Sequence, residues 1–212
     1  MGIKYHLGCG TQYKDGYVNI DNPPSEHSIA NVRADVYGDL ITVPLEACSE
    51  IRSHHVFEHF NYMESLALLV KWARALEVGG LLIIDIPDLE VLAQELLSSI
   101  QKNEVIRTFK IVRLMYGSHE AEWAYHINGW SLRSLSHVLE KMGFEGVAAG
   151  RYGDRTSLFP NCGIGMQFKK IAVVENIEKI AENLLAFYTE LPAQQDLYDE
   201  FKKQFNILLK RI

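Results

Sequence analysis

The apolar run LLIIDIP at residues 81–87 constrains the fold more than any other stretch of the sequence. A run of this kind is typical of a strand in a parallel sheet that is buried on both faces. Parallel neighbours need a crossover of a dozen or more residues, which is usually a helix. The chain is therefore expected to alternate strands and helices, as α/β proteins do.

The rest of the sequence fits this alternation. A helix is predicted directly before the run, with Asn61 as its cap, Glu64 as the second member of a capping box, and Gly79 and Gly80 at its end. Further strands are expected at 3–7, 17–20, 29–36, 49–56, 144–149 and 163–170, and further helices at 88–115, 131–142 and, as a pair, within 175–212.

Composition and charge exclude several classes of protein. The net charge of −6, without a basic stripe, argues against nucleic acid as a partner. Three cysteines without a C-x-x-C pair favour a reducing compartment. No run approaches the roughly 18 apolar residues of a membrane span. A cytoplasmic protein without membrane insertion is expected.

A glycine loop follows the first predicted strand. Gly8 and Gly10 let the backbone approach a ligand, and Asp21, after the second strand, can accept hydrogen bonds from ribose hydroxyls. A dinucleotide fold needs a helix after the loop and an acid about 20 residues on. Here Asp21 follows Gly10 by 11 residues, and residues 11–16 are too few for a helix. S-adenosylmethionine, which has a ribose but no pyrophosphate, fits better.

With these features the sequence resembles the class I S-adenosylmethionine-dependent methyltransferases. The resemblance is to methyltransferase type 11-like proteins, in a bacterial subgroup with a shortened first crossover that is often linked to surface-glycan biosynthesis. It is carried, in order, by LGCGTQYKDGYVNID, GDLITVPL, HHVFEHF, VGGLLIIDIPDL and YGSHEAEWAYHINGWSLRSLSHVLEKMGFEGV. It implies an α/β, Rossmann-like, doubly wound, mostly parallel seven-stranded sheet with a shortened first crossover and C-terminal helices.

The resemblance also implies a division of the chain. Residues 1–170 would form the methyltransferase domain, with a helical and loop insertion at about 88–130 over the active site. Residues 171–212 would form a C-terminal helical extension. The apolar stripe in ENIEKIAENLLAFY fits packing, a homodimer surface or part of a lid, and the sequence does not separate these interpretations.

Cofactor contacts follow from the resemblance by position. The glycine loop would line the methionine part, Asp21 would hold the ribose hydroxyls, and Asn22 would lie beside the adenine. Asp39 and the backbone amide of Leu40 would also meet the adenine, and His54 would border the sulfonium. The predicted cofactor-binding residues are Gly8, Cys9, Gly10, Asp21, Asn22, Asp39, Leu40 and His54. The third loop glycine of the family pattern is missing.

Some of these residues also have a purely structural interpretation. Asp21 could be a turn residue before Pro23, and Asp39 could be a loop cap. Cys9 fits a small residue beside the ligand better than a nucleophile, because the sequence places no base next to it.

The predicted reaction is O-methylation of a sugar or other small-molecule hydroxyl, with S-adenosylhomocysteine as the product. In-line methyl transfer depends largely on positioning, and a hydroxyl acceptor also benefits from a base such as histidine. The candidate catalytic residues are His119, His126 and His55. Aromatic residues interleaved with the first two could stack on a sugar or ring substrate: Trp123, Tyr125 and Trp130. The structural alternative is a packed loop.

Other functions stay open at this point. One is a non-catalytic S-adenosylmethionine-binding module, and another is a nicotinamide-dependent sugar-nucleotide enzyme. A third comes from residues 55–59, which fit the H-x-x-E-H zinc signature of inverted metalloproteases. That signature needs both histidines on one helix, whereas the helix here is expected to begin only at Asn61.

The same stretch has a further metal interpretation. Some ubiquinone-pathway and small-RNA O-methyltransferases carry E-x-x-E-H in this place, with a distant histidine that completes a divalent site. Here Glu58 and His59 match, His55 replaces the first glutamate, and His119 is the candidate distant ligand. No metal is predicted from the sequence, and a divalent site made of these residues is kept as an alternative.

Overall fold

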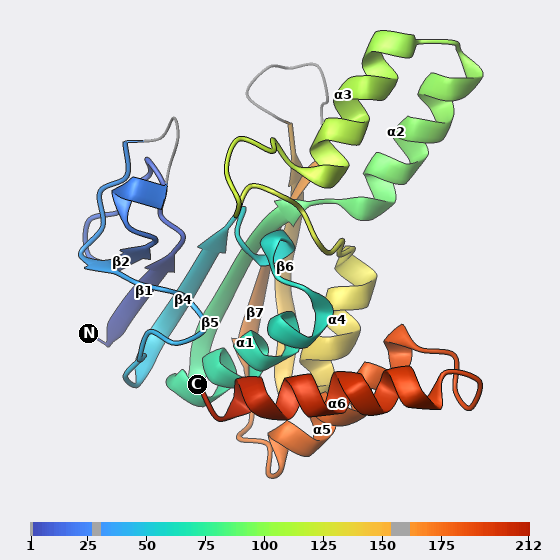
Figure 1. Ribbon diagram of the computed structural model, residues 1–212. Helices are drawn as coiled ribbons and strands as arrows, with labels where there is room; N and C mark the ends of the chain where they lie inside the picture. Colours follow the sequence, from blue (N-terminus) through green and yellow to red (C-terminus); the bar gives the residue numbers. More distant parts are fainter. Residues whose placement is uncertain (1, 27–30, 154–161) are drawn as a thin grey trace.

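A computed structural model describes residues 2–26, 31–153 and 162–212 (Figure 1). Its seven-stranded sheet has the order β3-β2-β1-β4-β5-β7-β6. Strand β7 is antiparallel to β5 and β6, and the other four pairings are parallel, so the predicted mostly parallel seven-stranded sheet is confirmed. The strands are β1 (Ile3–Leu7), β2 (Val18–Asp21), β3 (Val36–Tyr37), β4 (Cys48–His54), β5 (Leu76–Pro87), β6 (Phe144–Tyr152) and β7 (Gly163–Lys170).

Most of the helices lie on one side of this sheet. Figure 1 shows α1, α4, α5 and α6 on the same face, while α2 and α3 form a hairpin that projects beyond the end of β5. Within the described residues no helix is both long and apolar enough for a membrane crossing. The helices are α1 (Tyr62–Ala75), α2 (Leu89–Gln101), α3 (Val105–Tyr116), α4 (Leu132–Lys141), α5 (Ile177–Leu184) and α6 (Gln195–Leu209), with 3₁₀ turns η1 (Pro24–Glu26), η2 (Phe57–His59) and η3 (Leu185–Tyr188).

Helix α1 begins where the sequence predicts. The Asn61 side chain accepts a hydrogen bond from the Glu64 amide, and the Glu64 side chain accepts one from the Asn61 amide, both at 3.0 Å. The helix ends earlier than predicted, at Ala75. Leu76 already pairs with Cys48 as the first residue of β5, so pairing with β4 takes over before the two glycines.

Two other predicted elements differ from the structure. The single helix expected at 88–115 is two helices, α2 and α3, because Asn103 between them has a positive φ of 56°. The strand expected at 29–36 is reduced, in its described part, to Val36 at the start of the two-residue β3; residues 27–30 lie outside the described residues. The remaining predicted strands and helices are present.

Replacing Asn61 by alanine is expected to lower the free energy of unfolding by about 1 kcal/mol, because the first turn of α1 loses its side-chain acceptor. Urea denaturation of the two proteins measures this difference. Asn61→Asp keeps an acceptor at the cap and serves as the control. Equal stability of Asn61→Ala and wild type would contradict a stabilising role of the cap.

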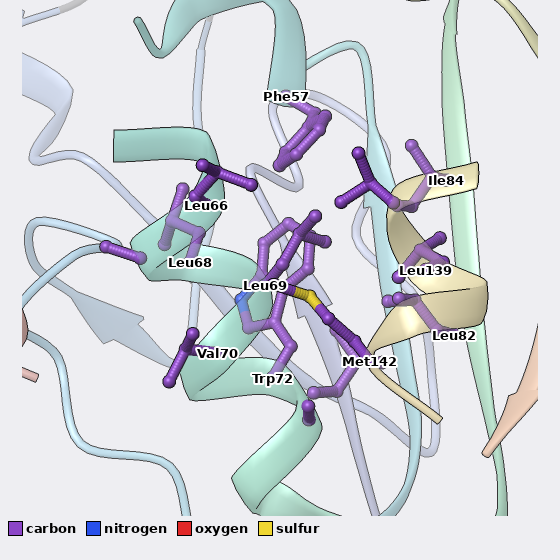
Figure 2. Close-up of a cluster of buried hydrophobic side chains, with 14 of the residues drawn as sticks. Phe57, Leu66, Leu68, Leu69, Val70, Trp72, Leu82, Ile84, Leu139 and Met142 are labelled. Atoms are coloured by element: carbon purple, nitrogen blue, oxygen red, sulfur yellow. The ribbon is translucent and has the colours of Figure 1, made fainter. Parts of the chain in front are cut away.

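The core lies between the sheet and the helices. Figure 2 shows Trp72 of α1 at the centre of this core, near Leu82 and Ile84 of β5. On the opposite face of the sheet, Arg52 of β4 and Asp85 of β5 form an ion pair at 3.3 Å, and both are partly exposed. The prediction of a sheet buried on both faces therefore holds fully on the helix side and only in part on the other, where Ile83 of β5 is buried but Arg52 and Asp85 are partly exposed.

Candidate active site

A cavity of about 630 Å³ lies at the carboxyl ends of β1, β2 and β4. The structure brings all eight residues predicted to bind the cofactor into its lining: Gly8, Cys9, Gly10, Asp21, Asn22, Asp39, Leu40 and His54. The rest of the lining comes from the neighbouring loops and from the end of the chain: Thr11, Gln12, Ile41, His55, Val56, His59, Phe60, Glu64, Glu122, Trp123, Ile127 and Arg211.

The glycine loop forms one wall of this cavity. Gly8 has a positive φ of 63°, and a Cβ atom there would lie 1.9 Å from Cγ2 of Val56. The backbone of the loop therefore packs directly on the segment that follows β4. Gly10 also has a positive φ, of 53°, and its amide donates to Oδ2 of Asp21 at 2.6 Å. Both glycines are needed for their backbone conformation.

Gly8→Ala is expected to lower the free energy of unfolding by about 2–5 kcal/mol, as left-handed strain and overpacking add. Gly16→Ala is the matched control, because Gly16 has a φ of 81° with open space around it. Gly16→Ala should therefore lower the free energy of unfolding only by the backbone strain, about 1–2 kcal/mol. Val56→Ala should recover part of the loss in the Gly8→Ala background. Urea denaturation checks all four proteins, and equal losses in the two glycine variants would refute the clash.

Asp21 combines a structural position with access to the cavity. Only 7% of it is exposed, and its Oδ1 accepts a hydrogen bond from the Asn22 amide at 2.7 Å. The two amides fix the carboxylate beside the cavity, and a carboxylate offers about four lone-pair sites, more than two amide donors use. Beside it, burial and the Asp21 charge raise the pKa of the Cys9 thiol to about 12. A thiol with this pKa is a poor nucleophile, which agrees with the sequence interpretation.

Asp39 is a loop cap that also lines the cavity. Its Oδ1 accepts from the Ile41 amide at 2.9 Å, and its Oδ2 accepts from the Thr42 hydroxyl at 3.2 Å. The guanidinium of Arg211 lies 3.5 Å from the same oxygen. Arg211 follows α6, and no local motif marks it as a site residue, so reasoning from sequence missed it.

His55 has a side chain that is held by hydrogen-bond partners on both ring nitrogens. Its φ of 51° is positive, which is uncommon for a residue with a side chain. Its Nδ1 lies 3.0 Å from Oε1 of Glu58, and its Nε2 lies 3.0 Å from the hydroxyl of Tyr152 on β6. Because a carboxylate only accepts, Nδ1–H donates to Glu58 and Nε2 accepts from Tyr152. Tyr152 was not predicted from the sequence.

Glu58 and Tyr152 both suit these roles. Burial acts to raise the pKa of Glu58, but the hydrogen bond from His55 and the electrostatic effect of the histidines around it outweigh burial and hold the pKa below its ordinary value. Burial raises the pKa of the Tyr152 phenol, so its hydroxyl stays protonated and can donate. The result is a histidine held between an ionised carboxylate and a neutral phenol.

The other two candidate bases lie outside the lining of the cavity. His119 is exposed, stacks on Tyr125 with ring centroids 4.2 Å apart, and its Nε2 lies 2.9 Å from the carbonyl oxygen of Tyr116. His126 is half-buried, and its Nδ1 lies 2.9 Å from the carbonyl oxygen of Leu114. Burial lowers the pKa of His126. A base must come within hydrogen-bond reach of its substrate, so the geometry favours His55.

The three aromatic residues that were predicted to stack on a substrate lie in different surroundings. Trp123 lines the cavity and meets the ring of His59 edge to face, with centroids 5.8 Å apart. Tyr125 instead stacks on a histidine outside the cavity. Trp130 is only 3% exposed and packs in the core against Phe57. Of the three, only Trp123 is placed to meet a ligand in this cavity.

The H-x-x-E-H stretch does not form the helical pair of a metalloprotease. Its last three residues form the 3₁₀ turn η2, and α1 begins only at Tyr62. His55 and His59 therefore do not lie one turn apart on one helix. Glu58, His59 and His126 instead form a cluster in which one ligand atom of each lies within 4.8 Å of the others. His126, rather than His119, is the distant histidine of this cluster.

No protein-family model and no curated protein matches this sequence. Among solved structures, the chain is similar to a candidate methyltransferase from Bacillus halodurans C-125, with a TM-score of 0.53 and 11% identity over 81% of this chain and 93% of that one. It is also similar to a structure of the Haloferax volcanii Trm112 methyltransferase activator with a candidate methyltransferase, with a TM-score of 0.52 and 12% identity over 81% and 83% of the two chains.

Some of the similar structures are longer proteins. The chain covers 48% of the mitomycin 7-O-methyltransferase MmcR, at a TM-score of 0.48 and 11% identity over 79% of this chain. It thus spans about half of the length of such proteins. At these identities the similarity shows the fold alone. Together with the sheet order, it shows that the chain has the Rossmann-like fold of the class I methyltransferases.

Proposed function

We propose that the protein is an S-adenosylmethionine-dependent methyltransferase that binds its cofactor in the cavity at the ends of β1, β2 and β4. One observation carries the proposal: the glycine loop and the fixed carboxylate of Asp21 face the same cavity, as a ligand with a ribose requires. The similar structures described as methyltransferases support it.

The lining fits the parts of this cofactor. The backbone of the glycine loop would contact the methionine part, and Asp21 would accept hydrogen bonds from the two ribose hydroxyls. Asn22, Asp39 and Leu40 would surround the adenine, next to the guanidinium of Arg211. His54, at the end of β4, would border the sulfonium. When bound there, the cofactor supplies an electrophilic methyl group.

A dinucleotide fits this cavity less well. Within the described segment 2–26, β1 leads to β2 through turns and no α-helix intervenes, so no helix N-terminus receives a pyrophosphate. The amide of Gly10, which could otherwise meet a phosphate, donates to Asp21. Both observations argue against the nicotinamide-dependent alternative.

We assign His55 as the base for an oxygen acceptor. Glu58 holds Nδ1 of His55 protonated, so Nε2 carries the lone pair. The hydroxyl of Tyr152 lies where the hydroxyl of an acceptor could donate to Nε2. An acceptor hydroxyl that replaces Tyr152 would give its proton to Nε2 as its oxygen takes the methyl group. A sugar hydroxyl is the favoured acceptor class, supported by Trp123 on the cavity wall, because aromatic side chains can stack on sugar rings.

Two measurements test this function. Mass spectrometry of small molecules released from the purified protein should find S-adenosylmethionine or S-adenosylhomocysteine, whereas a dinucleotide would contradict the proposal. Transfer of a labelled methyl group to a panel of nucleotide sugars and glycans then separates an enzyme from a binding module. Bound cofactor without transfer to any hydroxyl compound in the panel would favour the module.

A further inference from the structure

A cluster of side chains at the edge of the cavity has no role in the proposed methyl transfer beyond the contact of Glu58 with His55. It consists of Glu58 and His59 from η2 and His126 from the segment between α3 and α4. One ligand atom of each residue lies within 4.8 Å of those of the other two. His59 lines the cavity, so the cluster adjoins the proposed cofactor site.

Both histidines of the cluster are held in the same tautomer. Nδ1 of His59 lies 2.9 Å from the carbonyl oxygen of Tyr125, and Nδ1 of His126 lies 2.9 Å from that of Leu114. A carbonyl oxygen only accepts, so each Nδ1 carries a proton, and each neutral ring has its lone pair on Nε2. Metal-binding histidines usually carry an outer hydrogen bond of this kind.

Glu58 needs a further partner. It is only 2% exposed, and its Oε1 accepts from His55. Its Oε2 is buried and has no hydrogen-bond partner among the described residues. Nε2 of His126 lies 3.9 Å from Oε1, which is too long for a hydrogen bond. Lone pairs on imidazole nitrogens next to a buried carboxylate repel each other unless a cation or a proton lies between them.

We propose that Glu58, His59 and His126 bind one divalent transition-metal ion. Two imidazoles and one carboxylate suit zinc, iron, manganese or cobalt, whereas magnesium and calcium prefer oxygen ligands. Metal–ligand distances of about 2.0–2.2 Å place tetrahedral ligand atoms roughly 3.5 Å apart, so small side-chain rotations close the cluster on an ion. Three protein ligands leave a position open for water or an oxygen ligand from the cavity.

Calorimetric titration of the metal-free protein with Zn²⁺ and with Co²⁺ tests this site. Wild type should bind one ion per chain, and His126→Ala and Glu58→Gln should each bind it at least about tenfold more weakly. His119→Asn, which tolerates the positive φ of residue 119, and His137→Ala on α4 are the controls and should bind as wild type does. No saturable binding by wild type, or unchanged affinity in His126→Ala, would overturn the proposal.

Thermal unfolding with and without Zn²⁺ shows whether a variant that fails to bind metal is still folded. Bound metal should raise the Tm of wild type and of His137→Ala, because it binds only the folded state. The rise should disappear in His126→Ala, whose metal-free Tm shows whether it is folded. An equal rise in His126→Ala would contradict the assignment. Titration of the same samples with S-adenosylhomocysteine distinguishes failure of the metal site from failure of the proposed function.

Discussion

Asp21→Ala is expected to weaken binding of S-adenosylmethionine by about 100-fold or more. Hydrogen bonds to a charged group contribute about 1.5–3 kcal/mol each, and the proposed ribose contacts supply two of them. The loop also loses the acceptor that its Gly10 amide uses. Isothermal titration of the purified variant with S-adenosylhomocysteine measures the loss.

Two control variants make this test specific. Asp15→Ala removes an exposed carboxylate from the same loop, outside the cavity lining, and should leave the affinity within about twofold of wild type. Asp21→Asn keeps an acceptor oxygen without the charge and should lie between the two. If Asp21→Ala is folded and binds as tightly as wild type, the assignment of the glycine loop to the ribose is wrong.

His55→Ala is expected to lower the rate of methyl transfer by about 10²–10⁴-fold, the usual contribution of a general base. Cofactor affinity should change much less, since the main cofactor contacts come from the glycine loop and Asp21. Single-turnover rates at saturating cofactor, measured with an acceptor identified from the panel, separate the two effects. Tyr152→Phe keeps Nε2 of His55 and should retain most of the rate.

The same assay compares His55 with His119, another base predicted from the sequence. His119→Ala should retain its rate, because the ring of His119 lies outside the cavity lining and stacks on Tyr125. A loss in His119→Ala as large as in His55→Ala would favour the assignment made from sequence. An unchanged rate in His55→Ala would remove His55 as the base.

Features that depend on local sequence were predictable. Strand β1 begins and ends as expected, and α1 starts at its capping box, because both patterns act within a few residues. The glycine loop and Asp21 were found because their spacing along the chain fixes which strand ends they follow. The carboxyl ends of neighbouring parallel strands meet at one edge of the sheet, so this spacing was enough to place them around one cavity.

Features that depend on tertiary pairing were not predictable in the same way. The end of α1 is set by the pairing of Leu76 with Cys48, which no local signal reveals. His119 and His126 belong to one segment, and no local signal reveals that His126, rather than His119, lies next to Glu58. Arg211 reaches the cavity only because α6 packs along α1.

The most direct test of the proposed function is a calorimetric comparison of S-adenosylhomocysteine with NAD⁺ as ligands of the wild-type protein. S-adenosylhomocysteine should bind one molecule per chain in the micromolar range or tighter, and NAD⁺ should not compete with it. Binding of NAD⁺ in place of S-adenosylhomocysteine, or no binding of the latter to the folded protein, would contradict the assignment of the cavity to S-adenosylmethionine.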